Sequence, residues 1–352
     1  MKQLTQEVEG KVFQVHGVGE HKRRLLVDLA QAGPILDATL QGDLVRVVTR
    51  EENAQKGIEA LCGNADYTIV PCPPRFEDAF INRLGGVQEH LQLDYQLPNG
   101  KSATPPVEAR NLSKRFGSFT AVNQINFSMQ RGEIFGLLGP NGAGKSTTFK
   151  MLCGLLKASS GDPFVEGIPM IQAPSHARAQ IGYMAQGFSL YNNLTVLQNL
   201  RFFGGSYAVP NLGQRIDALL STFGLIPYTD TYPKTLPLGL KQRLALCCAL
   251  LHHPPILFLD EPTAGVDPLT RREFWLHINN LTRNGASVLV STHLMDEAEF
   301  CDRIGFIYEG QLKVVGTPSE LRAYGKSAST PNPTLTDAFL ALCGTPEKQG
   351  GN

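Results

Sequence analysis

The sequence contains no hydrophobic run long enough to cross a lipid bilayer. A transmembrane helix needs about 20 consecutive, mostly apolar residues, whereas the longest apolar segments here, residues 133–139 and 256–259, have the length of a strand. The first residues, MKQLTQEVEGKV, also lack the apolar centre of an export signal. If the protein serves a membrane, we therefore expect a separate subunit to cross it.

An excess of positive charge is also missing. The chain has 32 Lys and Arg residues and 32 Asp and Glu residues, so its formal net charge is zero. A general nucleic-acid-binding protein needs an excess of cations to displace the counterions of the phosphate backbone. We therefore expect no nucleic-acid partner.

Cysteine is scarce and forms no recognisable framework. There are seven cysteines, an odd number, and no C-x-x-C pair. This argues against a zinc site or a disulfide framework and fits a reducing, cytosolic setting better. Cys153, Cys247 and Cys248 lie in apolar runs, so we expect them to be small core residues.

The chain divides into four regions. Residues 1–90 alternate β-like and helical runs, an order typical of a small α+β domain, with the ferredoxin-like fold as one candidate. The expected strands are 11–16, 43–49 and 67–70, and the expected helices are 21–32 and 53–62. A linker is expected at 91–106, where Pro, Gly, Ser and Asn are frequent. The main domain is expected at 107–316, and a C-terminal tail at 317–352.

The clearest motif follows an apolar strand. Residues 133–139 lead directly into GPNGAGKST, which matches the phosphate-binding pattern G-x-x-x-x-G-K-[ST] in its strand–loop–helix context. Glycines let the backbone wrap around phosphates, so that N–H groups and the helix N-terminus face negative charge. We expect Lys145 to reach the β- and γ-phosphates of ATP and Ser146 to hold Mg²⁺. The loop residues are Gly139, Pro140, Asn141, Gly142, Ala143, Gly144, Lys145, Ser146 and Thr147.

Two adjacent carboxylates, Asp260 and Glu261, follow a second apolar strand. The carboxyl ends of parallel strands face the ligand crevice, so both side chains are able to reach the nucleotide. Seen alone, such a pair is more often a strand-end cap. With a phosphate-binding loop upstream, we expect Asp260 to join the Mg²⁺ shell and Glu261 to polarise the attacking water as general base.

Together these motifs resemble those of the ABC (ATP-binding cassette) ATPases, over residues 107–316. The resemblance implies that Phe116 stacks on adenine, an interaction worth about 1–3 kcal/mol at comparable sites. It also implies that Gln186 of the Q-loop contacts Mg²⁺ and the lytic water, and that His293 senses the γ-phosphate. Asp267 matches the aspartate of the D-loop.

The fold that the resemblance implies is an α/β P-loop cassette. It consists of a RecA-like core, an antiparallel β subdomain and a helical subdomain at about 190–251. The small α+β domain precedes this cassette.

One motif departs from the family pattern. The signature L-S-G-G-[QM] appears as Leu236-Pro237-Leu238-Gly239-Leu240. In the family, its serine and glycines donate hydrogen bonds to the γ-phosphate held by the opposite cassette. Pro237 has neither a hydroxyl nor an N–H, and Leu238 crowds the close backbone approach. Losing one such donor costs about 3–4 kcal/mol, so we expect the partner site that this signature completes to be slow or only nucleotide-binding.

An internal repeat makes the resemblance more specific, to one group of ABC ATPases. PRFEDAFI at 74–81 recurs as PTLTDAFL at 333–340, and a repeat at domain spacing indicates duplicated units. With the Leu-Pro-Leu-Gly run and MDEAEFCDR at 295–303, it makes the chain similar to the second cassette of tandem-cassette ABC-2-type exporter ATPases, the YbhF-like proteins. Residues 1–90 are then expected to be the trailing part of a preceding cassette. An independent accessory domain is the alternative.

This resemblance implies an ATPase that works with ABC-2-type permease subunits and a second cassette, self or separate, at the inner face of the cell membrane. Residues 186–195, with Phe188 and Tyr191, are expected to dock a coupling helix of the permease. The alternatives are a soluble ABC ATPase without a membrane role and a catalytically idle nucleotide-binding subunit. The transported substrate is not readable, because such subunits contact the permease and not the cargo.

Overall fold

The computed structural model describes residues 5–63, 67–86, 95, 97, 104–172, 175–187, 190–327, 330 and 332–344. The chain forms two compact units. The first unit comprises Met1–Gln96, Leu190–Leu251 and Thr263–Asn284, and the second comprises Leu97–Ser189, His252–Pro262 and Gly285–Asn352. The domain boundaries expected from the sequence stay a prediction. Most of the expected linker and Phe188 lie outside the described residues.

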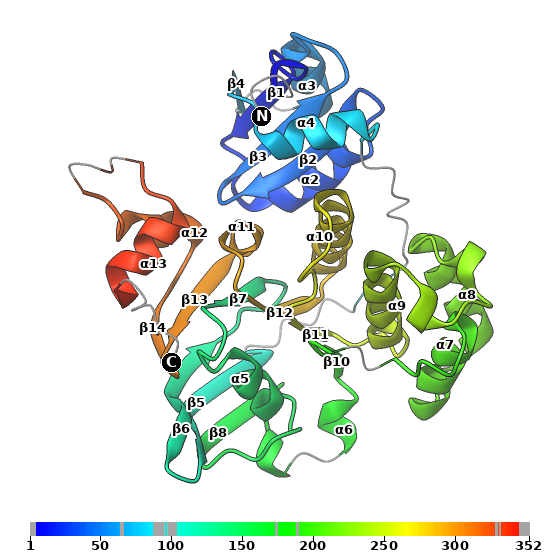
Figure 1. Cartoon of the computed structure of the whole chain (residues 1–352), viewed down its shortest axis with the longest axis vertical. Coiled ribbons are helices and arrows are strands. Elements are labelled where there is room, and N and C mark those ends of the chain that lie inside the picture. Colours follow the sequence, from blue (N-terminus) through cyan, green and yellow to red (C-terminus); the bar gives the residue numbers. More distant parts are fainter. Residues whose placement is uncertain are drawn as a thin grey trace, which may run out of the picture. The chain divides into compact units, whose positions relative to one another are not determined.

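The first unit begins with a four-stranded antiparallel sheet of order β2-β3-β1-β4 (Figure 1). Its elements are β1 (Val12–His16), α2 (Lys22–Ala30), β2 (Ile35–Gln41), β3 (Leu44–Thr49), α3 (Gln55–Cys62) and β4 (Thr68–Pro71). This β-α-β-β-α-β order is the ferredoxin-like arrangement. Strand β2 was not expected from the sequence. Its sequence, ILDATLQ, alternates apolar and polar residues, but the strand is buried along nearly its whole length, so the polar Asp37 and Thr39 are covered as well.

The internal repeat marks the start of a helix in both places. Helix α4 (Phe76–Arg83) begins with the Arg75 N–H donating to the Asp78 carboxylate at 2.6 Å, and α13 (Leu335–Cys343) begins with the Thr334 N–H donating to Asp337 at 2.8 Å. An acidic residue at this position satisfies a backbone donor that the helix leaves free. Asp78 is also fully buried and accepts from Arg46 at 2.6 Å.

Four helices complete the first unit. They are α7 (Val196–Ser206), α8 (Leu212–Thr222), α9 (Leu238–Leu250) and α10 (Pro268–Arg283). Helices α7, α8 and α9 pack together through buried aliphatic residues such as Leu200, Leu219 and Leu244. Helix α10 packs against α2 and α4 of the ferredoxin-like part, so this part and α10 belong to one packed unit (Figure 1).

The core of the second unit is a six-stranded sheet of order β10-β11-β12-β7-β13-β14. Its strands are β7 (Ile134–Leu138), β10 (Ile181–Met184), β11 (Ile256–Asp260), β12 (Ser287–Thr292), β13 (Arg303–Tyr308) and β14 (Gln311–Gly316). The first five strands are parallel, and β14 is antiparallel to β13. Buried parallel strands read as continuous apolar runs, which is why β7 and β11 were visible in the sequence.

An antiparallel sheet of order β6-β5-β8-β9 accompanies this core. Its strands are β5 (Val107–Phe116), β6 (Phe119–Ser128), β8 (Ser160–Val165) and β9 (Ile168–Pro169). Helix α5 (Lys145–Leu152) lies between the two sheets (Figure 1), and its Phe149 ring meets Phe258 of β11 edge-on at 5.8 Å. The P-loop α/β fold with an antiparallel β subdomain is thus confirmed.

Short helices complete the second unit. They are α6 (Ser175–Arg178), α11 (Met295–Ala298), α12 (Pro318–Ala323) and α13. The segment that was expected to be a tail therefore carries two helices, and Phe339 of α13 packs its ring 5.4 Å from that of Phe306 in β13. Within the described part of the chain, no helix has the length and apolar character needed to span a membrane.

Candidate nucleotide-binding site

The loop between β7 and α5 has the backbone shape of a phosphate cradle. Gly142 and Gly144 adopt left-handed φ values of 82° and 103°, which glycine reaches without steric cost. A Cβ on Gly139 would lie 2.1 Å from the carbonyl oxygen of Ile307, and one on Gly144 would lie 2.6 Å from that of Ala121. The glycines at these positions therefore keep the loop close to its neighbours, with α5 starting directly after it.

Lys145 is the first residue of α5, and its ammonium group lies within this loop. Nζ donates to the carbonyl oxygens of Gly139 at 2.7 Å and Pro140 at 3.0 Å. It also lies 3.5 Å from Oε1 of Glu261. Burial lowers the pKa of Lys145, and the carboxylate of Glu261 opposes that shift. An anionic ligand would favour the charged form of this buried amine in the same way.

Asp260 ends β11 and receives two hydroxyl hydrogen bonds. Ser146 donates to its Oδ1 at 3.1 Å, and Ser291 donates to the same oxygen. Burial raises the pKa of Asp260, and these two hydrogen bonds act against that rise. Ser291 was missed in the sequence. Its position in β12, directly opposite Asp260 in the parallel ladder, was not available without the strand order.

Glu261 is the centre of the site. Its backbone has a φ of 50°, which is uncommon for a residue with a side chain. Ser291 supports this conformation, since its carbonyl oxygen and hydroxyl accept from the Glu261 N–H at 3.1 and 3.0 Å. Such backbone strain recurs at functional sites where the surroundings hold it.

Three predicted residues meet at the Glu261 carboxylate. Gln186 Nε2 donates to Oε2 at 3.1 Å, and His293 Nδ1 lies 3.3 Å from the same oxygen. Lys145 approaches the other oxygen. Gln186 follows β10 and His293 follows β12, so the carboxyl ends of neighbouring parallel strands bring these side chains together.

Phe116 occupies a different setting. It ends β5 at a turn into β6, its side chain is 50% exposed, and Lys114 Nζ lies 5.0 Å from the ring centroid. Leaving a large aromatic ring in water forgoes about 1.5–3 kcal/mol of burial free energy. This exposure suits a ring that contacts a ligand, and its role toward adenine stays a prediction.

The donors at the loop suit a hard cation. Among the described residues, no three His, Cys, Asp or Glu side chains cluster as a metal site. Mg²⁺ is typically bound through one or two carboxylates plus phosphate oxygens and water. The hydroxyl of Ser146 beside the carboxylate of Asp260 fits that requirement, whereas the Gln186 amide is engaged with Glu261.

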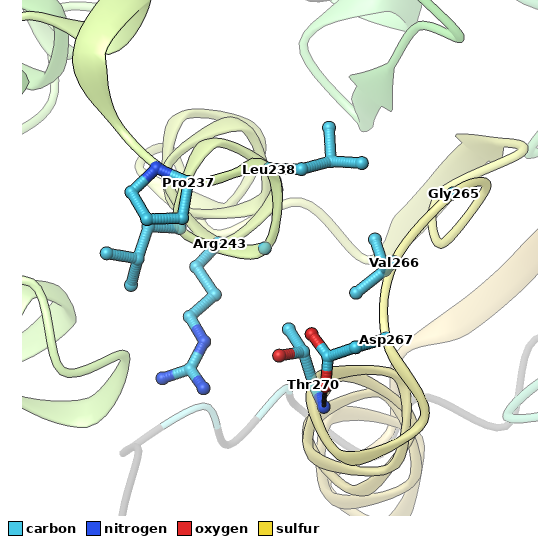
Figure 2. A pocket seen from close by; sticks show the side chains of 9 residues that line it. Pro237, Leu238, Arg243, Gly265, Val266, Asp267 and Thr270 are labelled. Carbon is cyan, nitrogen blue, oxygen red and sulfur yellow. Dashed lines mark hydrogen bonds between the residues drawn. The ribbon is translucent and has the colours of Figure 1, made fainter.

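The degenerate signature and the D-loop both belong to the first unit. They line a cavity of about 290 Å³, with Pro237 and Leu238 at the start of α9 and Val266, Asp267 and Thr270 across from them (Figure 2). Asp267 caps α10 by accepting from the Thr270 N–H at 3.0 Å. The signature segment thus has no hydroxyl and no N–H at Pro237, and an aliphatic side chain at Leu238, where the family pattern has a serine and a glycine.

Comparison with known proteins identifies the family of the chain. The family model described as ABC transporter matches residues 122–264. The Nod factor export ATP-binding protein I of Burkholderia lata is 40% identical over 219 residues, which cover 61% of this chain and 72% of that relative. The chain belongs to the ABC transporter family of ATP-binding proteins. The Escherichia coli K12 probable multidrug ABC transporter ATP-binding protein YbhF is 47% identical over 356 residues, and the alignment covers this whole chain.

This ABC protein spans 62% of the length of YbhF. Among solved structures, it resembles the dimeric post-hydrolysis state of the ATP-binding cassette MJ0796 bound to ADP and Pi. The TM-score is 0.56 at 26% identity, covering 60% of this chain and 98% of that one. The ABC resemblance expected from the sequence is therefore confirmed, and nucleotide binding by the cassette follows from it.

Proposed function

We propose that the chain is the ATP-binding and ATP-hydrolysing subunit of an ABC-type exporter that energises a separate membrane permease. The observation that carries this proposal is the Glu261 carboxylate, buried and contacted by Lys145, Gln186 and His293. Phosphoryl transfer needs positioning and charge stabilisation more than covalent chemistry from the protein. This cluster supplies both.

ATP is bound by its phosphates at the glycine loop. The loop N–H groups and the start of α5 face the phosphates, and Lys145 exchanges its carbonyl partners for phosphate oxygens. Phe116 stacks on the adenine ring. Ser146 and Asp260 would hold Mg²⁺, which would neutralise charge on the phosphates.

Glu261 is the general base. Its oxygen accepts the proton of the attacking water, while the Gln186 amide orients the carboxylate by donating to it and His293 lies beside the same oxygen. The hydrogen bonds that Asp260 accepts from Ser146 and Ser291 favour the ionised form of its carboxyl.

A second cassette completes the site, supplied by another copy of this chain or by a separate one. The signature of this chain has no hydrogen-bond donor at Pro237, and it has Leu238 in place of a small residue. The site that it completes on its partner is therefore slow or only nucleotide-binding. The chain's own site depends on the partner's signature.

An exposed aromatic cluster in the first unit docks the permease, which is of the ABC-2 type. The cluster consists of Tyr191, Phe202 and Phe203. The Tyr191 and Phe202 rings lie 4.6 Å apart, and these two side chains are 43% and 46% exposed. Asn199 fixes the Tyr191 backbone through hydrogen bonds of 2.9 and 3.1 Å. Through this contact the subunit sits at the inner face of the membrane.

The export role rests on the relatives, whose names include Nod factor export and multidrug transport. A soluble ABC ATPase without a membrane role is less well supported, since these relatives are named as ATP-binding proteins of transport or export. The test is co-purification of the chain with co-expressed permease subunits of the ABC-2 type. Tyr191→Ala with Phe202→Ala should abolish co-purification and leave ATP binding unchanged. Retained permease binding by this variant contradicts the docking surface.

A further inference from the structure

Three consecutive residues near the start of α10 reach three different parts of the first unit. They are Arg271, Arg272 and Glu273. Successive side chains of an α-helix point about 100° apart, so a run of three polar residues is able to contact three separate neighbours. The start of α10 is such a junction.

Two of these contacts hold the D-loop and the signature helix. Arg271 Nη2 donates to the carbonyl oxygen of Val266 at 3.4 Å, in the segment between Glu261 and α10. Glu273 forms a close ion pair with Arg243 of α9, the helix that starts at the signature. The starts of α9 and α10 also lie close together, because a Cβ on Gly239 would lie 2.4 Å from Thr270 Cγ2.

The third contact reaches the ferredoxin-like part. Arg272 Nε lies 3.6 Å from Asp37 Oδ2 of β2, and Arg272 Nη2 lies 3.2 Å from Glu77 Oε2 of α4. Arg272 and Asp37 are both buried, and Asp37 Oδ1 has no hydrogen-bond partner within the described part of the chain. Burial raises the pKa of this carboxyl, and the guanidinium of Arg272 opposes that rise. Removing one member of such a buried pair leaves the other charge uncompensated.

We propose that the ferredoxin-like part, acting through Arg272, sets the orientation of the first turns of α10 and thereby of the D-loop and the signature helix. Arg272 is then a positioning residue for ATP hydrolysis, and Asp37 and Glu77 are its anchors. This inference rests on the proposed function, because it concerns the rate of that same reaction. It assigns the N-terminal part of the chain a role in turnover.

The test uses the full chain and two variants that weaken the contact from opposite sides, Arg272→Met and Glu77→Gln. Glu77 is partly exposed, so its variant should fold even if Arg272→Met does not. We expect kcat to fall about tenfold in Arg272→Met and less in Glu77→Gln, since small misplacements far from the chemistry can cost up to about 10²-fold. The Kd for ATP should stay within about twofold, because the predicted phosphate-binding residues belong to the second unit. Arg272→Lys, which keeps the cation, should recover most of the loss.

Arg283→Met is the matched control. Arg283 lies at the other end of α10 and also joins the ferredoxin-like part, 3.3 Å from Asp28 of α2. It should leave kcat unchanged, because it does not touch the first turns of the helix. The inference is overturned if both test variants turn over at the wild-type rate, if ATP affinity falls in proportion to kcat, or if the control is equally slow. A wild-type chain no faster than Glu261→Gln would instead sink the proposed function itself, and this inference with it.

Discussion

Replacing Ser291 by alanine removes the hydroxyl that joins the two acidic residues of the site. This hydroxyl donates to Asp260 and accepts from the Glu261 N–H at 3.0 Å. The N–H keeps a second acceptor, the Ser291 carbonyl at 3.1 Å, so the main loss is the bond to the Asp260 carboxylate. A hydrogen bond to a charged group contributes about 1.5–3 kcal/mol. At 1.36 kcal/mol for each factor of ten, kcat should fall by about 10- to 150-fold.

The assay is steady-state ATP hydrolysis by purified Ser291→Ala protein, with Ser287→Ala as the matched control. Ser287 is also buried in β12, and its hydroxyl accepts from the Gly132 N–H at 2.9 Å, at the other end of the strand. Ser287→Ala should therefore lose a neutral hydrogen bond, worth about 0.5–1.5 kcal/mol, and keep its kcat. The reasoning is refuted if Ser291→Ala keeps more than about half of the wild-type kcat, or if both variants slow equally.

Three further changes probe the loop and the ferredoxin-like part. Lys145→Met should raise the Kd for ATP by about 10- to 100-fold in calorimetric titration, because it removes a charge-assisted bond worth about 1.5–3 kcal/mol; an unchanged Kd would contradict the phosphate role. Gly144→Ala should lower the free energy of unfolding by about 1–3 kcal/mol in urea titration, since the φ of Gly144 is 103° and the added Cβ would meet a carbonyl oxygen. In the control Gly142→Ala the added Cβ has no atom within 4 Å, so the free energy of unfolding should fall less. Asp78→Asn leaves Arg46 buried without its anion, so the free energy of unfolding should fall by about 3–5 kcal/mol. A fall below about 1 kcal/mol in the same urea titration would show that the ion pair is not stabilising.

The parts of the site that lie close together in the sequence were predictable. The loop residues are contiguous, and Asp260 and Glu261 directly follow an apolar strand, so periodicity and spacing were enough to find them. Gln186 and His293 came from the family resemblance, and the structure brings both to the same oxygen of Glu261.

The residues that were missed depend on pairing between distant segments. Ser291 joins the site because β12 lies beside β11 in register, which the sequence does not specify. Strand β2 alternates apolar and polar residues, yet its polar Asp37 is buried, and the cation beside it, Arg272, belongs to a helix far along the chain. A buried charge is recognisable only with its partner.

The central claim is that Glu261 drives ATP hydrolysis by this chain. Turnover of the wild-type protein at saturating ATP and Mg²⁺, compared with that of Glu261→Gln, tests it most directly. The amide keeps the shape of the side chain and cannot accept the proton, so the wild type should be faster by about 10²- to 10⁴-fold. Equal rates in the two proteins would contradict the account.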